Sequence, residues 1–297
     1  SAYGAIGNQY FRYYDRRMAT AVTTSGQLAI RWIENDVNRY LNRILQTDDK
    51  DYVIASDTDS IYVCFDELVS KSFNEKSDIP NDRIVSFLAS VAKEKLEPFI
   101  DESYKRLAKY VKPYQQKMVM SREVIADKGI WTAKKRYILN VYDSEGVRYK
   151  EPQLKVMGIE AVKSSTPAPC REMIKTALKI IINEDEVTLN TFIQSFRKTF
   201  MDLNPEEIAY PRSCNNLQKY KSESNIWTNG TPMHVKGALV YNYILKRDKL
   251  VNKYPLIQEG DKIKFLEVTT PNAYRTNVIS FMTRLPKEFD LHNQINY

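Results

Sequence analysis

The segment "VIASDTDSIYVCF" (residues 53–65) places two aspartates, Asp57 and Asp59, in a polar turn between two apolar runs. The runs, Tyr52–Ala55 and Ile61–Phe65, are rich in the β-branched and aromatic residues that favour strands. Two such runs separated by a short polar stretch are typical of a β-hairpin. We therefore expect a hairpin whose turn carries both acids.

The spacing of these acids is informative because no Lys, Arg or His lies between residues 51 and 70. If the backbone stays extended through Thr58, Asp57 and Asp59 share one face, roughly 7 Å apart. Two ionised carboxylates so placed repel, and one takes up a proton unless a cation lies between them. Hard oxygen ligands select Mg²⁺ or Mn²⁺, and Mg²⁺ keeps positions open for water and phosphates. The pair is interpreted as half of a metal site that handles phosphates.

Two other interpretations of the turn are weighed against the metal site. A bare Asp-x-Asp in a loop is more often a solvated acidic turn than a ligand set. An EF-hand loop fits poorly, because the glycine and the closing glutamate that it needs are missing from their required places. The apolar strands on both sides favour the metal interpretation, since they would hold the turn rigidly.

The composition is that of a globular protein with room for two domains: 297 residues, 43% hydrophobic and 27% charged. There is no run of about 18 uncharged apolar residues and no secretory signal pattern, so we expect no membrane span. Three scattered cysteines and two histidines argue against a zinc site and favour a reducing compartment. A net charge of +7 suits nucleic-acid contact, although a solvated surface explains it equally well. The 20 tyrosines suit base stacking and phosphate contact, although core packing is the commoner use of any single tyrosine.

Apolar periodicity predicts two long helices in the first half of the chain. Residues 25–45 carry apolar side chains at three- and four-residue spacing, with Ser25 as a candidate N-cap. Residues 82–110 repeat the pattern, and Pro98 should kink or interrupt that helix.

The second half begins with strands and continues with helices. Residues 136–142 and 147–149 flank "DSEG", whose glycine can supply the left-handed residue of a hairpin loop. Helices are predicted at about 169–183 and 187–202. A polar, loop-rich stretch at 204–233 is expected to precede short strands and turns.

Several segments, taken in order, resemble the family B DNA polymerases, and most closely their T-even-like phage type. "SAYG" (1–4) resembles the end of the fingers motif Kx₃NSxYG, and "ASDTDSIYV" (55–63) resembles the palm motif YxDTDS. "WTAKKRYILNVYD" (131–143) resembles the KKRY segment of the family, and "KVMGIE" (155–160) resembles its KxxGxE element. Two later segments are similar to thumb segments: "HVKGALVYN" (234–242) and "RLPKEF" (284–289). The resemblance covers nearly the whole chain.

The resemblance implies an α+β fold, in which a palm with antiparallel β-hairpins packed on helices is followed by a mainly helical thumb. It places the end of the fingers helix at 1–8 and the C-terminal part of the palm at 9–158. The thumb would occupy 159–297 and be incomplete at its C-terminus.

The resemblance also assigns acidic residues to a catalytic metal centre. Asp59 matches the carboxylate that bridges both metal ions, and Asp57 matches the nearby one that tunes their coordination. Thr58 is small and polar, which permits close approach of the primer end. Glu123 in "MSREVI" resembles a further palm acid, and Asp143 belongs to the shared "NVYD".

Other residues match positions that contact the nascent base pair or the duplex. Tyr3 and Gly4 match the pair beneath the nascent base pair, where the tyrosine checks shape. A core aromatic is the less favoured interpretation of Tyr3. Four residues match the strip that holds the duplex: Lys134, Lys135, Arg136 and Tyr137. Lysines there neutralise phosphate or donate to minor-groove acceptors without reading sequence. Lysine is also common on an exposed strand edge, where its charge prevents pairing with another strand.

The activity implied is DNA-directed nucleotidyl transfer from a dNTP to the 3′-hydroxyl of primer–template DNA, with two Mg²⁺ ions, or Mn²⁺ in their place. The family's motif A aspartate, in DxxSLYP, does not occur in these residues, nor do the triphosphate-binding residues of the fingers or the exonuclease domain. From the resemblance we expect that the short aromatic tail that docks a sliding clamp is not present in this chain.

We therefore expect the chain alone to bind duplex DNA weakly and not to polymerise. It would need an N-terminal polymerase fragment that carries the exonuclease, the motif A aspartate and the fingers. The resemblance places the protein in the cytoplasm of a phage-infected cell, at the nucleoid. The alternative function is a non-catalytic palm and thumb module that only binds duplex DNA.

Overall fold

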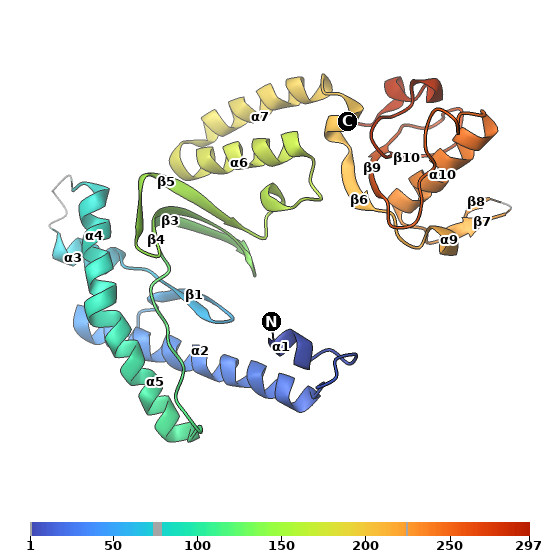
Figure 1. Cartoon of the computed structure of the whole chain (residues 1–297). Helices are drawn as coiled ribbons and strands as arrows, with labels where there is room; N and C mark the ends of the chain where they lie inside the picture. The colour runs from blue at the N-terminus through green and yellow to red at the C-terminus, as the bar shows by residue number, and fades with distance from the viewer. Residues whose placement is uncertain (1, 74–78, 224) are drawn as a thin grey trace. The chain divides into compact units, whose positions relative to one another are not determined.

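The computed structural model describes residues 2–73, 79–223 and 225–297, and Figure 1 follows the chain through its helices and strands. Long helices and sheets of two or three strands occur in separate stretches of the sequence. This arrangement confirms the expected α+β class. In the described part of the chain, no helix is both long enough and apolar enough to cross a membrane.

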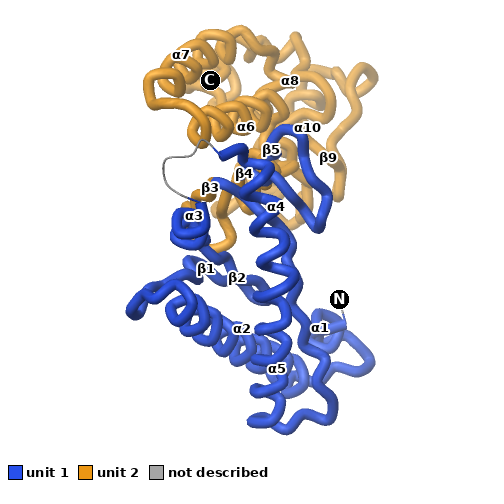
Figure 2. The backbone as a smooth tube through the Cα atoms, turned by 90° about the vertical axis from the view of Figure 1, so that its left-hand side faces the viewer, with its two compact units in different colours: residues 1–127, 140–153 blue, residues 128–139, 154–297 orange. Residues whose placement is uncertain are grey.

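The chain forms two compact units, coloured separately in Figure 2. Unit 1 comprises residues 1–127 and 140–153, and unit 2 comprises residues 128–139 and 154–297. Whether the units correspond to a palm and a thumb stays a prediction.

Unit 1 combines long helices with a two-stranded hairpin. Its elements are α1 (Ala2–Ile6), α2 (Arg16–Leu45), β1 (Val53–Asp57), β2 (Ser60–Val63), α3 (Asp66–Ser72), α4 (Asn81–Val91), the π-helix η1 (Ala92–Leu96) and α5 (Glu97–Val111). Three further strands are β3 (Val124–Ala133), β4 (Arg136–Ser144) and β5 (Val147–Met157), which form a sheet in that order. The residues of this sheet are divided between the two units.

Helix α2 supplies the core of unit 1 through one apolar stripe. Its buried residues recur every four positions: Ala29, Ile33, Val37, Leu41 and Leu45. They pack in one cluster with Ile100, Tyr104 and Leu107 of α5 and with Tyr52 before β1. The apolar stripe was predicted from periodicity, and it fixes α2 against α5 and the hairpin.

The predicted start of α2 at Ser25 is wrong, because the helix begins at Arg16. Asp15 is the N-cap, and its carboxylate accepts hydrogen bonds from the N–H groups of Arg17 and Met18. The first turns are solvent-exposed and carry no apolar stripe, so periodicity could not detect them.

The second predicted helix is interrupted as expected from its proline. Pro98 lies in the first turn of α5, and the five residues before α5 form the π-helix η1. Proline has no N–H to donate to the carbonyl four residues earlier, so the ladder there shifts to five-residue spacing. The N–H of Glu97 accordingly donates to Ala92 O.

The hairpin expected around "DSEG" is present between β4 and β5. Gly146 adopts φ +88° and Glu145 φ +51°, the left-handed pair of a two-residue loop. Strand β3, which precedes them, was not predicted from the sequence.

Unit 2 begins with the two helices that periodicity predicted. Its elements are η2 (Glu160–Val162), α6 (Ala168–Asn183), α7 (Glu186–Met201), α8 (Pro205–Ile208), β6 (Tyr210–Ser213), α9 (Leu217–Tyr220), β7 (Lys221–Ser222), β8 (Ile226–Trp227), α10 (Met233–Arg247), β9 (Lys262–Glu267), β10 (Val278–Phe281), η3 (Lys287–Phe289) and η4 (His292–Gln294). Strands β10, β9 and β6 form an antiparallel sheet in that order, so this unit is less purely helical than expected.

Helix α10 is the centre of the unit 2 core, and the sequence did not predict it. Eight of its residues are buried: Val235, Gly237, Ala238, Leu239, Val240, Tyr241, Ile244 and Leu245. A helix buried on most sides has no polar face, so the amphipathic signal is weak. Gly237 lets α10 lie directly on β10, because a Cβ there would be 2.5 Å from Ser280 Oγ and 2.7 Å from Ser280 N.

Candidate functional site

The predicted hairpin is present, and its tip is tighter than expected. Strand β1 ends at Asp57 and β2 begins at Ser60, and these two residues are paired in the antiparallel register. Only Thr58 and Asp59 form the turn. The N–H of Asp59 donates to Asp57 O at 2.6 Å, which closes a three-residue turn around Thr58.

The premise of an extended backbone through Thr58 is therefore wrong. Thr58 has φ +53°, in the left-handed region, which a β-branched residue rarely adopts. Its hydroxyl donates to Asp57 Oδ1 at 3.0 Å, and the Ser60 hydroxyl donates to Asp57 O at 3.1 Å. Such strained residues cluster at functional sites, at a cost of about 1–3 kcal/mol each. Asp57 is half-buried at the strand end, whereas Asp59 is exposed on the turn.

The base of the hairpin is held by Asn38 of α2. Its Oδ1 accepts hydrogen bonds from the N–H groups of Tyr52 and Val53, each at 2.9 Å. Its Nδ2 donates to Asp51 Oδ1 at 3.2 Å. On the other strand, the N–H of Cys64 donates to Tyr52 O at 2.8 Å. The hairpin is thus fixed to α2 at the end opposite its acidic turn.

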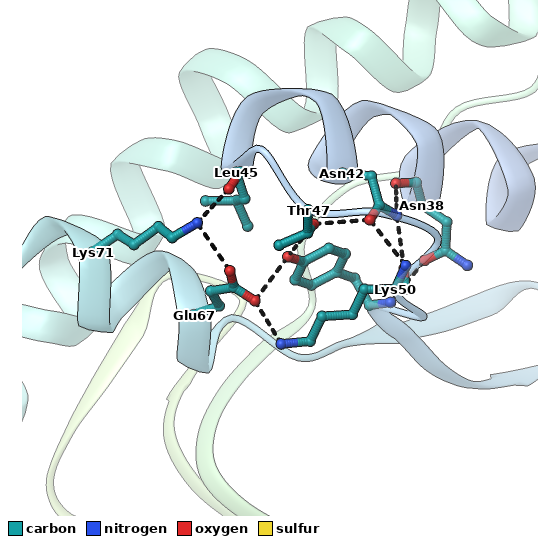
Figure 3. A network of polar contacts seen from close by, with 8 residues as sticks. Asn38, Asn42, Leu45, Thr47, Lys50, Glu67 and Lys71 are labelled. Carbon is teal, nitrogen blue, oxygen red and sulfur yellow. Dashed lines mark hydrogen bonds and ion pairs between the residues drawn. The ribbon is translucent and has the colours of Figure 1, made fainter.

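A second anchor is Glu67 of α3, which Figure 3 shows among its partners. Its carboxylate accepts hydrogen bonds from Lys50 Nζ at 2.5 Å, Lys71 Nζ at 2.9 Å and the Tyr52 hydroxyl at 3.1 Å. Lys50, then Lys71, lower the pKa of Glu67 to about 2. Tyr52 Oη also lies 2.9 Å from Thr47 Oγ1. Sequence reasoning missed this network, because its members lie on α3 and on the segment between α2 and β1, which only the fold brings together.

Glu123 lies in a cavity of about 810 Å³ in unit 1. The residues that line it come from the α4–η1–α5 helix, from the approach to β3 and from the β4–β5 loop: Ala89, Ser90, Lys93, Glu94, Glu97, Ser121, Arg122, Glu123 and Glu145. Neither Asp57 nor Asp59 is among them. The cavity therefore gathers Glu123 with other glutamates and not with the hairpin acids, and a catalytic role for Glu123 stays a prediction.

Asp143 is buried, with 3% of its surface exposed. Its carboxylate is ion-paired with Arg122, lies 3.4 Å from Arg148 Nε and accepts a hydrogen bond from Gly146 N at 3.0 Å. Burial would raise the pKa of Asp143, but the hydrogen bonds from Arg122 and Gly146 outweigh it and hold the pKa below its ordinary value. These contacts organise the β4–β5 loop, and a role for Asp143 in catalysis stays a prediction.

The four residues of the KKRY segment have different surroundings in unit 2. Lys134 and Lys135 are exposed and form the whole turn between β3 and β4, with Lys135 at φ +61°. Tyr137 is buried in β4, with its ring centroid 6.3 Å from that of Trp131. A stacking contact with a base would require this ring to be uncovered.

Arg136 and Lys135 contact the KxxGxE segment. Arg136 Nη2 donates to both carboxylate oxygens of Glu160, each at 2.6 Å. Gly158 has φ +67°, and a Cβ on it would lie 2.0 Å from Lys135 O. The two sequence motifs, which are separated by residues 138–154, thus contact each other in the structure.

Tyr3 and Gly4 lie on the short helix α1, and both are exposed, with 47% of Tyr3 accessible. The interpretation of Tyr3 as a core aromatic does not fit this exposure. Its backbone carbonyl accepts a hydrogen bond from Gly7 N at 3.1 Å, which closes the last turn of α1. Their role beneath a nascent base pair stays a prediction.

The chain resembles the family B DNA polymerases of T-even phage type. No family model matches the chain. The chain is 37% identical over 299 residues to the DNA-directed DNA polymerase of Enterobacteria phage T4, covering 97% of this chain and 32% of that protein. It is 40% identical over 305 residues to the DNA-directed DNA polymerase of Escherichia phage RB69, covering 98% of this chain and 33% of that protein. The chain spans about a third of the length of these curated relatives, and the expected resemblance is confirmed.

Proposed function

We propose that the chain forms the palm and thumb part of a DNA-directed DNA polymerase, which adds dNTPs to the 3′-hydroxyl of a primer. The observation that carries this proposal is the 37–40% identity to two phage DNA-directed DNA polymerases over at least 97% of the chain. The acid-tipped hairpin supports it, because two carboxylates at a rigid turn are suited to phosphate-transfer chemistry.

The hairpin acids suit magnesium as ligands but do not make a whole site. Asp57 and Asp59 offer hard oxygen atoms at one turn, which Mg²⁺ prefers. Within residues 2–73, 79–223 and 225–297, no three His, Cys, Asp or Glu side chains gather closely enough to hold a metal ion. We therefore propose that further ligands come from polypeptide outside these 297 residues, in keeping with the third of the relatives' length that the chain spans.

In the proposed mechanism, Asp59 and Asp57 would hold two Mg²⁺ ions. Such ions, when bound, lower the pKa of the primer hydroxyl and stabilise the leaving pyrophosphate. The chain's own contribution is alignment: Asn38 and Glu67 fix the base of the hairpin, and the tight turn fixes its tip. Alignment of this kind supplies much of the rate in phosphoryl transfer, which needs little covalent chemistry from the protein.

Duplex binding is assigned to unit 2. Lys134 and Lys135 project from a tight turn and would neutralise phosphate charge without reading bases. Tyr3 and Gly4 are proposed to line the pocket of the nascent base pair. With protein contacts that do not read bases, the incoming nucleotide is selected by base pairing with the template, as template copying requires.

The test is reconstitution of primer extension. The purified chain is mixed with the polypeptide from the same source that carries DxxSLYP and the fingers lysine, and extension of a labelled primer is followed with dNTPs and Mg²⁺. We expect template-dependent extension from the mixture and none from either part. Extension by the 297-residue chain alone would overturn the proposed need for a partner. No extension from a mixture that forms a complex on DNA would favour a module that only binds duplex DNA.

A further inference from the structure

The contact between Arg136 and Glu160 changes the role expected for this arginine. Arg136 Nη2 lies 2.6 Å from both oxygens of Glu160, so one N–H-bearing nitrogen is committed to the carboxylate. Glu160 also accepts from Lys163 Nζ at 3.1 Å. Lys163, together with Arg136, holds the pKa of Glu160 below its ordinary value, so the carboxylate is charged at neutral pH. The Nη2 end of the guanidinium is thus directed to Glu160 and not to a DNA phosphate.

The same segment supports the lysine turn sterically. Lys134 and Lys135 are the only residues between β3 and β4, and Arg136 is the first residue of β4. Gly158 lies against the Lys135 carbonyl so closely that a Cβ would meet the oxygen at 2.0 Å. The ion pair at Arg136 and the glycine contact at Lys135 therefore hold adjacent residues of one turn from one segment, 158–160.

We propose that Glu160 and Gly158 are positioning residues, which hold the Lys134–Lys135 turn in the conformation that binds duplex DNA, and that Arg136 acts through Glu160 instead of contacting DNA. The inference rests on the proposed function, since it assumes that this turn binds a duplex. It assigns to the KxxGxE segment the task of shaping the KKRY turn.

The proposal predicts that Glu160→Gln weakens DNA binding, which is the opposite of what the change in charge alone would do. Removing an acid beside a DNA-binding turn should strengthen binding to DNA if electrostatics alone acts, because phosphates repel carboxylates. If Glu160 positions the turn, the same change weakens binding, because the lysines lose their fixed geometry. Arg136 and Glu160 have 42% and 46% of their side chains exposed, and exposed pairs contribute little to stability. The variant should therefore fold normally.

The experiment measures binding of the 297-residue chain to a fluorescent primer–template duplex by anisotropy, from 50 to 200 mM salt. We expect Glu160→Gln to weaken binding about 3- to 10-fold. We also expect it to reduce the slope of log K against log salt by about 1–2, because one or two fewer phosphates are then neutralised. The matched control is Glu172→Gln, which removes the same charge from a pair with Lys175 on α6. It should leave affinity unchanged or slightly raise it.

A double-mutant cycle separates positioning from direct contact. Arg136→Gln should weaken binding as much as Glu160→Gln, and the double variant should be no weaker than either. Additive losses, or tighter binding by Glu160→Gln, would show that Arg136 contacts DNA directly and would overturn the proposal. Unchanged affinity in Glu160→Gln would overturn it too. If the unaltered chain shows no salt-dependent duplex binding, the proposed function itself fails, which is a distinct result.

A steric variant tests the same idea without changing charge. Gly158→Ala should weaken duplex binding, because its methyl group displaces the Lys135 carbonyl. The control is Gly260→Ala, since Gly260 has φ +83° but open space around a Cβ. Both variants carry the same kind of backbone strain, and only the first touches the lysine turn. Equal affinities for the two variants would contradict the proposal.

Discussion

Replacing Gly237 by alanine should destabilise the core of unit 2, although alanine is the better helix former. An added Cβ would lie 2.5 Å from Ser280 Oγ, 2.7 Å from Ser280 N and 2.9 Å from the Ile279 carbonyl carbon. Two of these atoms belong to the backbone of β10, so rotation of a side chain cannot relieve the clash. Overpacking of a core typically costs about 1–3 kcal/mol. The helix propensity gained is about 1 kcal/mol. We expect a net loss of up to about 2 kcal/mol in the free energy of unfolding.

The matched control is Gly26→Ala in the exposed part of α2, where a Cβ would meet nothing within 4 Å. That variant gains helix propensity and should be more stable by up to about 1 kcal/mol. Urea unfolding followed by circular dichroism measures both variants, with the midpoint read for the transition of the unit concerned. Adding Ser280→Ala to Gly237→Ala should recover only part of the loss, because the backbone nitrogen remains. Stabilisation by Gly237→Ala, similar to that by Gly26→Ala, would refute the packing of α10 on β10.

Three further predictions concern unit 1. Asn38→Ala removes the acceptor of two backbone N–H groups at the start of β1. It should lower the free energy of unfolding, measured in urea, by about 1–3 kcal/mol. The control Asn35→Ala, at an exposed position, should change that free energy by less than about 0.5 kcal/mol. The pKa of Glu67 is lowered to about 2 from an ordinary 4.5, so the contribution of its carboxylate to stability is complete above pH 4.5 and is lost as the pH falls toward 2. Glu67→Gln should therefore flatten the curve of unfolding free energy against pH in that window. An unchanged curve would contradict the network in Figure 3. Asp143→Asn breaks a buried ion pair and should lower the free energy of unfolding by about 1.5–3 kcal/mol. Asp82→Asn, at a side chain that is 78% exposed, should change it by no more than about 0.5 kcal/mol. Equal effects of the two variants would show that the burial of Asp143 does not set it apart from Asp82.

The sequence was most informative where one face of an element is apolar and the other polar. The stripe on α2 from Ala29 to Leu45 and the helices α6 and α7 have this character, and all were predicted. The β1–β2 hairpin was predicted from two β-prone apolar runs around a polar turn. The glycine of the β4–β5 loop was predicted as well, because a left-handed residue there favours glycine. The motifs supplied the resemblance that the comparisons confirm.

The sequence failed where burial or tertiary contact overrides local pattern. Helix α10 is buried on most sides, and the first turns of α2 are exposed all round, so neither has the contrast that periodicity detects. The conformation of Thr58 was mistaken, because its local preference for an extended backbone is overridden by the tight hairpin. The contact of Arg136 with Glu160 joins residues 24 positions apart, and no local rule connects them.

The most direct test of the proposed catalytic hairpin is single-turnover extension by the reconstituted polymerase with Asp59→Asn. Duplex affinity is measured separately for each variant, and Asp48→Asn, an exposed acid outside the hairpin, serves as the control. If Asp59 holds the catalytic metal ions, the extension rate should fall by about 10²–10³-fold, as it does when a charge-stabilising group is lost. Duplex affinity should remain unchanged, and Asp48→Asn should behave like the unaltered chain. An extension rate for Asp59→Asn equal to that of the control would contradict a catalytic role for the hairpin.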